Sequence, residues 1–179
     1  MQSVVDIKLK ELKKWFSIRD NVMVAYSGGV DSSLLAQVAY LTLGSKAIAV
    51  TSDSPSIARK DLEDAKELAH LIGIQHIVIN TSEINNPDYF TNPENRCYFC
   101  KEELFKTLKN LANQEGIETI VDGTNNDDLS DYRPGTKAGD LYQIQRPFVE
   151  LKITKEEIRE MSRLFNLPTA DKPSSPCLS

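Results

Sequence analysis

The feature that most constrains the fold is a glycine-rich turn between a short apolar run and a helical pattern. The run VMVAY covers residues 22–26 and stops at Ser-Gly-Gly, and helical spacing of apolar residues follows over residues 31–43. Glycines in such a turn permit left-handed backbone geometry, so successive N–H groups can point into one concavity. The start of the helix adds the positive end of its dipole. The sequence therefore predicts a buried strand that leads into an anion-binding loop.

The loop differs from two better-known phosphate-binding motifs. SGGVDS is not followed by the Gly-Lys-Ser/Thr of a Walker A loop, and it is not GxGxxG. Asp31 is unusual in a pure anion site, but a carboxylate suits a Mg²⁺ ion that accompanies phosphates. Ser33 can donate a further hydroxyl hydrogen bond. The alternative interpretation of the whole SGGVDS segment is an ordinary glycine turn at the start of a helix. The expected nucleotide contacts in this segment are Ala25, Ser27, Gly28, Gly29, Val30, Asp31 and Ser32.

Strand and helix patterns alternate along most of the chain. This alternation predicts βαβ units and an α/β fold with a doubly wound parallel sheet. We expect a single domain over residues 1–179, in which residues 166–179 form a cysteine-containing tail. Residues 80–96 and 123–146 are expected to be irregular. The expected strands are 22–26, 47–50, 76–79 and 119–122, and the expected helices are 4–17, 31–43, 56–72, 101–115 and 154–165.

Residues that follow the other strands are further site candidates, because ligands of open parallel sheets bind beyond the carboxyl ends of the strands. Thr51 closes the second expected strand, and Gly123 follows the fourth. Asp127 and Asp128 are interpreted as metal or substrate groups, or as carboxylates of a capped, solvated turn. Arg133 can clamp a phosphate or a carboxylate with two hydrogen bonds, or it can be an ordinary surface arginine.

The chain contains three cysteines, Cys97, Cys100 and Cys177. Cys97 and Cys100 are one helical turn apart, a spacing that suits zinc, an iron–sulfur cluster or a redox pair. Because the number of cysteines is odd and the cytosol is reducing, the sequence disfavours a framework of structural disulfides. His70 and His76 belong to a helical and a strand pattern, which favours structural roles over zinc binding. Three unrelated buried cysteines are the alternative to a metal site.

Charge and hydropathy restrict the class of partner. The formal net charge is −5, and no basic block is longer than a pair of residues. Nucleic-acid-binding proteins usually show a basic face, so this composition disfavours a nucleic-acid partner without excluding a local basic groove. No apolar run is long enough for a membrane-spanning helix. The N-terminal sequence resembles neither a secretion signal nor a transit peptide, so a cytoplasmic protein is expected.

Several motifs together resemble the LarE family of ATP-dependent sulfur transferases. The match extends from about residue 20 to the end of the chain. SGGxDS after an apolar strand is also the hallmark of PP-loop ATP pyrophosphatases, which cleave ATP between the α- and β-phosphates. The motifs that carry the resemblance are SGGVDSSLL, RCYFCK (96–101), DGTNNDDLSDYRPG (122–135), KITKEEIREM and LPTADKPSSPCLS (167–179).

The resemblance implies a two-stage reaction. ATP, with Mg²⁺, adenylylates a carboxylate of a pyridinium dicarboxylate mononucleotide, and a sulfur nucleophile then displaces AMP to leave a thiocarboxylate. Some LarE proteins sacrifice a cysteine at the position of Cys177, whereas others hold a [4Fe–4S] cluster through three cysteines, here Cys97, Cys100 and Cys177. The presence of all three favours the cluster route, whose open iron carries a transferable sulfide. Asp31, Arg133 and Cys177 are the implied catalytic residues.

LarE chains normally continue past the Cys-Leu-Ser segment with further substrate-binding residues. We therefore expect the tail at residues 166–179 to lead into a C-terminal region that this sequence lacks. A cluster enclosed near a chain end also favours neighbouring subunits, so a homo-oligomer is expected. Three alternatives remain open: a tRNA-thiolating PP-loop enzyme, an amidating ligase of the NAD or GMP synthetase kind, and a nucleotide-binding or iron–sulfur-storage module without enzymatic activity.

Overall fold

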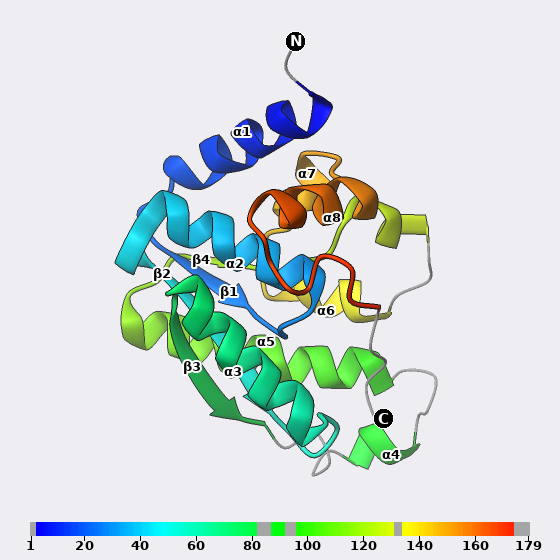
Figure 1. Cartoon of the computed structure of the whole chain (residues 1–179). Helices are drawn as coiled ribbons and strands as arrows, with labels where there is room; N and C mark the ends of the chain where they lie inside the picture. Colours follow the sequence, from blue (N-terminus) through cyan, green and yellow to red (C-terminus); the bar gives the residue numbers. More distant parts are fainter. Residues whose placement is uncertain (1–2, 82–86, 92–95, 131–133, 174–179) are drawn as a thin grey trace.

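The computed structural model describes residues 3–81, 87–91, 96–130 and 134–173, and it contains a parallel sheet with helices on both faces (Figure 1). The strands are β1 (Val22–Ala25), β2 (Ala47–Asp53), β3 (Gln75–Asn80) and β4 (Thr119–Val121). The α-helices are α1 (Val4–Ser17), α2 (Val30–Leu43), α3 (Arg59–Ile72), α4 (Pro87–Thr91), α5 (Arg96–Glu115), α6 (Pro134–Leu141), α7 (Pro147–Glu150) and α8 (Lys155–Leu164). Two 3₁₀ helices, η1 (Gly44–Lys46) and η4 (Asn126–Ser130), complete the described elements.

The strand order is β3-β2-β1-β4, and every pair is parallel. Val22 of β1 is in register with Ala47 of β2 on one side and with Thr119 of β4 on the other. The chain thus runs outward from β1 through β2 to β3, and then crosses back to place β4 on the opposite side of β1. This reversal puts the topological switch point between β1 and β4, where ligands of such sheets bind.

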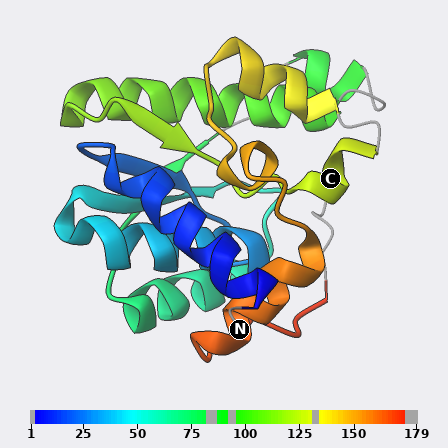
Figure 2. The same cartoon turned by 90° about the horizontal axis from the view of Figure 1, so that it is seen from above.

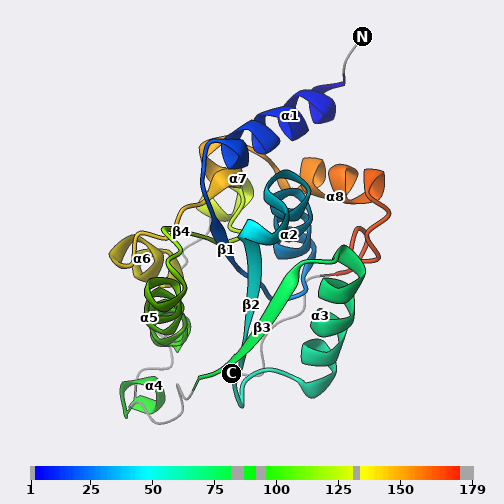
Figure 3. The ribbon, with the colours of Figure 1, turned by 90° about the vertical axis from the view of Figure 1, so that its left-hand side faces the viewer.

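Alternating strand residues divide the core into two layers. Val24 and Ala49 pack into one hydrophobic cluster, with residues of α1, α2, α3 and α8. Met23 and Ile48 belong to the second cluster, which contains residues of α5 and α6. Figure 3 shows the two helical layers on either side of the sheet. The fold predicted from the sequence, an α/β doubly wound parallel sheet, is confirmed.

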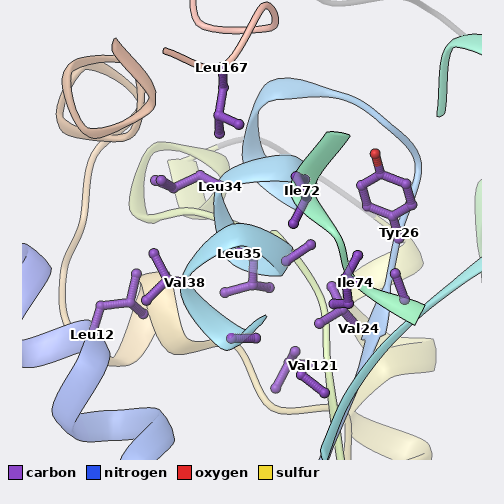
Figure 4. Packing of buried hydrophobic residues seen from close by; sticks show 14 of the residues in the cluster. Leu12, Val24, Tyr26, Leu34, Leu35, Val38, Ile72, Ile74, Val121 and Leu167 are labelled. Carbon is purple, nitrogen blue, oxygen red and sulfur yellow. The ribbon is translucent and has the colours of Figure 1, made fainter. Parts of the chain in front are cut away.

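Helix α2 lies at the centre of the larger layer. Its residue Leu35 points toward the sheet residue Val121, whereas Val38 lies beside Leu12 of α1 and Leu34 lies on the side of Leu167 (Figure 4). Leu34 and Leu35 are fully buried, and so are Ala36, Val38 and Ala39. A helix that is apolar around so much of its circumference is held rigidly by its neighbours. The loop that precedes α2 is therefore attached to a deeply buried helix.

Helix α1 is fastened by polar contacts to the segment around α7. Trp15 Nε1 donates to Glu150 Oε2 at 2.6 Å, and Lys8 Nζ donates to the Leu151 carbonyl at 2.5 Å. The Arg19 guanidinium stacks on the Trp15 ring at 3.1 Å from its centroid and also donates to Gln145 Oε1. Figure 2 shows α1 lying beside α2 and close to α7 and α8. The first helix of the fold thus packs against its last helices.

Three sequence-based expectations are corrected. Residues 80–96 contain α4, and residues 123–146 contain η4 and α6, so neither stretch is wholly irregular. Helix α5 begins at Arg96, five residues earlier than expected, and it includes both residues of the CxxC pair. The α6 sequence PGTKAGDL has weak helix propensity, but Gly135 and Gly139 allow close contact with Lys101 and Arg146. Tertiary packing therefore overrides local preference in α6.

Among the described helices, none has both the length and the apolar character needed to cross a membrane.

Candidate functional site

The glycine-rich loop follows β1 and lies at the switch point of the sheet. Gly28 has φ of 76°, the left-handed conformation that favours glycine. A Cβ at Gly28 would lie 2.8 Å from Ala65 Cβ and 2.9 Å from Ala65 Cα on α3. Both the backbone angle and the contact with α3 therefore require glycine here. The loop is pressed against α3 on one side and continues into α2 on the other.

Two serines tie the loop to the first turn of α2. The Ser27 backbone N–H donates to Ser32 Oγ at 3.1 Å, and the two serine hydroxyls lie 3.1 Å apart. Gly29 is the N-cap of α2, and within the described residues no side chain caps this helix. The first-turn amides of α2 are therefore available to an anion. Ser33 is fully buried, so it does not line the open side of the loop.

The segment after β4 closes over the same helix terminus. A Cβ at Gly123 would lie 3.0 Å from the Ser32 amide nitrogen, so a larger residue would require the start of α2 to move. Asn125 is 2% exposed, and its Oδ1 accepts from the Asp127 N–H at 2.9 Å. Asp128 Oδ2 accepts from the Asn125 N–H at 3.0 Å. Gly123 thus lies against the start of α2, whereas Asp127 and Asp128 take part in a hydrogen-bonded turn.

Asp31 and Lys155 form an ion pair beside the loop. Lys155 Nζ lies 2.5 Å from Asp31 Oδ2, and both side chains are about three-quarters buried. Asn125 Nδ2 donates to the other oxygen of the same carboxylate at 3.4 Å. Asp127 Oδ2 accepts from the Lys155 backbone N–H at 2.8 Å, which fixes the start of α8. Asp31 is therefore held on the site by groups from two distant segments.

Sequence reasoning missed Lys155 and Asn125. Lys155 is the first residue of α8 and follows the capping residue Thr154. A cation in the first helical turn opposes the helix dipole, and this mismatch was the available signal for a functional lysine. Asn125 is buried among polar backbone groups and gave no comparable signal. The side chain of Lys155 adds a positive charge to a site that otherwise offers amides, hydroxyls and the carboxylate of Asp31.

Thr51 takes a different position from the other predicted contacts. It is 3% exposed, and its hydroxyl contacts the Tyr26 carbonyl and the His76 ring. Its side chain therefore lies behind the loop, and direct contact between Thr51 and a nucleotide stays a prediction. Ala25 and Val30 flank the loop at the end of β1 and the start of α2.

A cavity of about 400 Å³ lies beyond the ends of β2 and β3. Arg59 and Asp53, which both line it, form an ion pair with 2.6 Å between Nη2 and Oδ1. The hydrogen bond from Arg59 lowers the pKa of Asp53 below its usual value. The cavity adjoins the carboxyl edge of the sheet and is lined by Asp53, Ser54, Pro55, Arg59, Asn80 and Thr81.

Cys97 and Cys100 lie in the first turns of α5, on the other helical layer. Cys97 is exposed and Cys100 is half-buried. Their spacing places both thiols on one side of the helix, so the two described cysteines fit a cluster bound at this surface. No group of three potential metal ligands occurs within the described part of the chain. Cys177, the third predicted ligand, and Arg133 both lie outside the described residues.

Comparison with known proteins gives three findings. The NAD synthase family model matches residues 4–176. An uncharacterized protein of Synechocystis sp. is 49% identical over 176 residues, which are 98% of this chain and 66% of the relative. The pyridinium-3,5-bisthiocarboxylic acid mononucleotide synthase of Lactiplantibacillus plantarum is 26% identical over 155 residues, 86% of this chain and 56% of that enzyme. The chain thus spans two thirds or less of the length of these relatives.

Solved structures support the architecture independently. The NMN synthetase of Francisella tularensis superposes with a TM-score of 0.77 at 19% identity, over 97% of this chain and 76% of the synthetase. At this identity the likeness concerns the fold alone. The parallel sheet and its helices are therefore those of the NAD synthetase type of α/β structure.

Proposed function

The chain belongs to the NAD synthase family, and from this premise we propose that it binds ATP on the glycine-rich loop and transfers AMP to a substrate carboxylate. The observation that carries the proposal is the start of α2, which has no side-chain cap. Two glycines precede it, and the hydroxyls of Ser27 and Ser32 lie beside it. Backbone amides, hydroxyls and a nearby lysine at a switch point suit a polyphosphate.

The residues of the site have distinct roles in this proposal. An oxygen of the substrate carboxylate attacks the α-phosphorus of ATP, and the bond to the bridging oxygen of pyrophosphate breaks. Pyrophosphate leaves with the bonding electron pair, and the loop amides and Lys155 stabilise its charge. Asp31 would hold Mg²⁺ once Lys155 has turned from the carboxylate to the phosphates. A Mg²⁺ ion bound there would neutralise phosphate charge.

We further propose that sulfur, rather than nitrogen, replaces AMP on the activated carboxylate. The support is the 26% identity to a synthase whose named product is a bisthiocarboxylic acid, together with the two thiols on α5, of which Cys97 is exposed and Cys100 is half-buried. Cys97, Cys100 and Cys177 would hold a [4Fe–4S] cluster, whose open iron would supply a site for sulfide. The proposed substrate is a pyridinium dicarboxylate mononucleotide, which the attacking sulfur converts to a thiocarboxylate while AMP leaves with its electron pair.

The ATP step is tested by following the products of ATP in the presence of the dicarboxylate substrate. We expect AMP and pyrophosphate to form in equal amounts, and substrate-dependent exchange of labelled pyrophosphate into ATP. The C97S/C100S double variant is the matched control, because it removes the thiols and leaves the loop unchanged. It should still carry out the exchange. Formation of ADP and phosphate would contradict the proposal.

The sulfur step is tested by anaerobic purification, iron and sulfide analysis, and an absorption spectrum. We expect about four irons per chain, with loss of iron when any one of the three cysteines is replaced by serine. A colourless protein after careful reconstitution contradicts the cluster. Mass analysis of the product then separates thiocarboxylate from amide, and an amide formed from ammonia would favour a ligase of the NAD synthetase kind.

A further inference from the structure

A buried hydroxyl group lies directly behind the glycine-rich loop. Thr51 Oγ1, on β2, is 2.8 Å from the carbonyl oxygen of Tyr26, the last residue before the loop. The same oxygen is 2.7 Å from Nε2 of His76 on β3. These two contacts link three neighbouring strands at the level where the loop begins. Thr51 is 3% exposed, so water does not compete freely for them.

The direction of each hydrogen bond follows from the chemistry of the three groups. A carbonyl oxygen only accepts, so Thr51 must donate its single hydroxyl proton to Tyr26. The remaining contact of Thr51 Oγ1 is then as an acceptor, and His76 Nε2 must carry the proton that is donated. Burial lowers the pKa of His76, and the charge of Lys66 on α3 lowers the pKa further. A neutral imidazole with its proton on Nε2 satisfies all of these conditions.

The Tyr26 carbonyl belongs to the peptide plane that opens the loop. The N–H of that same plane is the Ser27 amide, which donates to Ser32 Oγ at 3.1 Å. In a trans peptide the carbonyl and the N–H point in opposite directions. The plane is therefore held from both sides, by Thr51 behind the loop and by Ser32 within it. A change in the Thr51 contact would alter the direction of the Ser27 amide.

Packing around His76 restricts its ring as well. The rings of His76 and Tyr26 meet edge to face, with centroids 5.4 Å apart. The Tyr26 hydroxyl donates to the Ala65 carbonyl at 3.1 Å, and burial raises the pKa of Tyr26 to about 12, so it remains a donor. The charged group on α3 that acts on His76 is Lys66, which is itself paired with Glu63 at 2.7 Å. These contacts hold the imidazole in the orientation in which its Nε2–H reaches Thr51.

We propose that His76 is a positioning residue for the phosphate loop, which directs the Thr51 hydroxyl onto the Tyr26 carbonyl and so fixes the Tyr26–Ser27 peptide plane. The purpose of this positioning rests on the proposed binding of ATP at the loop. The side chain of His76 need not touch the nucleotide. His76 acts through the Thr51 hydroxyl on the Tyr26–Ser27 peptide group. The Ser27 N–H is thereby held in a fixed direction.

The test compares variants that keep or remove each hydrogen bond. H76L and T51V remove a donor at nearly constant volume, whereas H76Q and T51S retain one. His70 is the only other histidine of the chain, and it is exposed on α3, so H70Q is the matched control. The first measurement is hydrogen exchange of the Ser27 amide in nucleotide-free protein. We expect exchange to accelerate about tenfold in H76L and T51V, and to change less than about twofold in H76Q, T51S and H70Q.

A second measurement is made on the ring itself. Imidazole nitrogen chemical shifts above pH 8 should show the proton of His76 on Nε2, and T51V should shift this signal without affecting His70. Unchanged Ser27 exchange in a folded H76L protein, or a proton on Nδ1 of His76, overturns the proposal. Neither the hydrogen exchange of Ser27 nor the imidazole shifts require nucleotide, so they test the role of His76 even if ATP fails to bind.

Calorimetric titration with ATP then connects the geometry to binding. We expect about five- to tenfold weaker affinity in H76L and T51V and affinity within about twofold of the parent chain in H76Q, T51S and H70Q. H76L protein with faster Ser27 exchange and undiminished ATP affinity would overturn the positioning role. Absence of ATP binding in the unmodified chain would instead overturn the proposed function.

Discussion

The phosphate loop and the cysteine-bearing turns of α5 are both short motifs at the start of a helix, but their surroundings differ. At the loop, Gly28 contacts α3, Gly123 approaches α2, and Lys155 pairs with Asp31. At α5, Cys97 is exposed and Cys100 is half-buried. The loop motif is completed by contacts from three other segments, whereas the cysteine motif has one thiol at the surface and one half-buried. In our proposal, the ATP site is therefore built into the packing of the fold, whereas the cluster site would be added at the surface of one helix.

The most severe test of this difference is replacement of the packed glycine. G28A would place an alanine at a left-handed backbone angle, with its Cβ 2.8 Å from Ala65 Cβ. We expect this variant to lose about 2–5 kcal/mol of stability. Its affinity for ATP should fall at least about a hundredfold. Gly44 has φ of 59° but no atom within 4 Å of an added Cβ, so G44A isolates the backbone strain alone. G44A should lose about 1–3 kcal/mol and keep its ATP affinity. Urea unfolding and calorimetry measure both quantities, and equal effects of the two variants would refute the packing role of Gly28.

Removal of the lysine is expected to have the next largest effect. K155M leaves Asp31 without its cation, and if Lys155 moves to the phosphates the affinity for ATP should fall about tenfold. Lys13 is exposed on α1, so K13M is the control for a change in net charge. The D31N/K155M double variant measures the coupling, and we expect a non-additive result because the two side chains are in contact. Additive effects on ATP binding would contradict a shared role.

A pair of helix caps distinguishes local stability from site geometry. Ser3 and Thr154 begin α1 and α8 with the same capping box, closed by Asp6 and Glu157 respectively. S3A and T154A should each cost about 1 kcal/mol of stability in urea unfolding. Only T154A should also weaken ATP binding, about two- to threefold, because Thr154 precedes the lysine of the site. If S3A weakens binding equally, the effect comes from stability and not from the position of α8.

The pH dependence of stability tests the environment behind the loop. His76 has a folded-state pKa below that of the unfolded chain, about 6.5, because burial and then Lys66 disfavour its charged form. The unfolded chain therefore takes up this proton first as the pH falls, and the free energy of unfolding decreases from about pH 7 downward through the folded-state pKa. Urea unfolding between pH 8 and 5.5 should show this decrease. H76Q should reduce it, whereas H70Q should leave it intact.

The smallest expected effect is on ATP binding when the cysteines are replaced. C97S and C100S lie in the other helical layer and should change ATP affinity less than about twofold, while iron content falls to background. A large loss of ATP affinity would show that the two regions are coupled, and the contrast between them would then be wrong. The measurement is calorimetric titration of each variant, with iron assayed on the same samples.

Much of the fold was predictable because its signals are local. The bounds of α1 and α8 follow from apolar period and capping residues within the segment itself, and the loop is one continuous run of sequence. Helix α6 was not predictable, since its two glycines disfavour helix and its stability comes from α5 and Arg146. Lys155 was missed because it reaches Asp31 across 124 residues of sequence. The proposed cluster joins residues that sequence spacing alone does not bring together, and its prediction still rests on resemblance.

The central position of β1 has a consequence for the order of events during synthesis. When a ribosome has made β3, it has already made the whole SGGVDS motif, yet β1 has only β2 as a neighbour. The place of β4 beside Val22 stays empty until Thr119 emerges, and the partner of Asp31 comes later still. Such contacts between distant parts of the chain slow folding, because long loops must close before the contacts form. The SGGVDS motif therefore acquires its full set of neighbours late, and until then the central strand has an open edge.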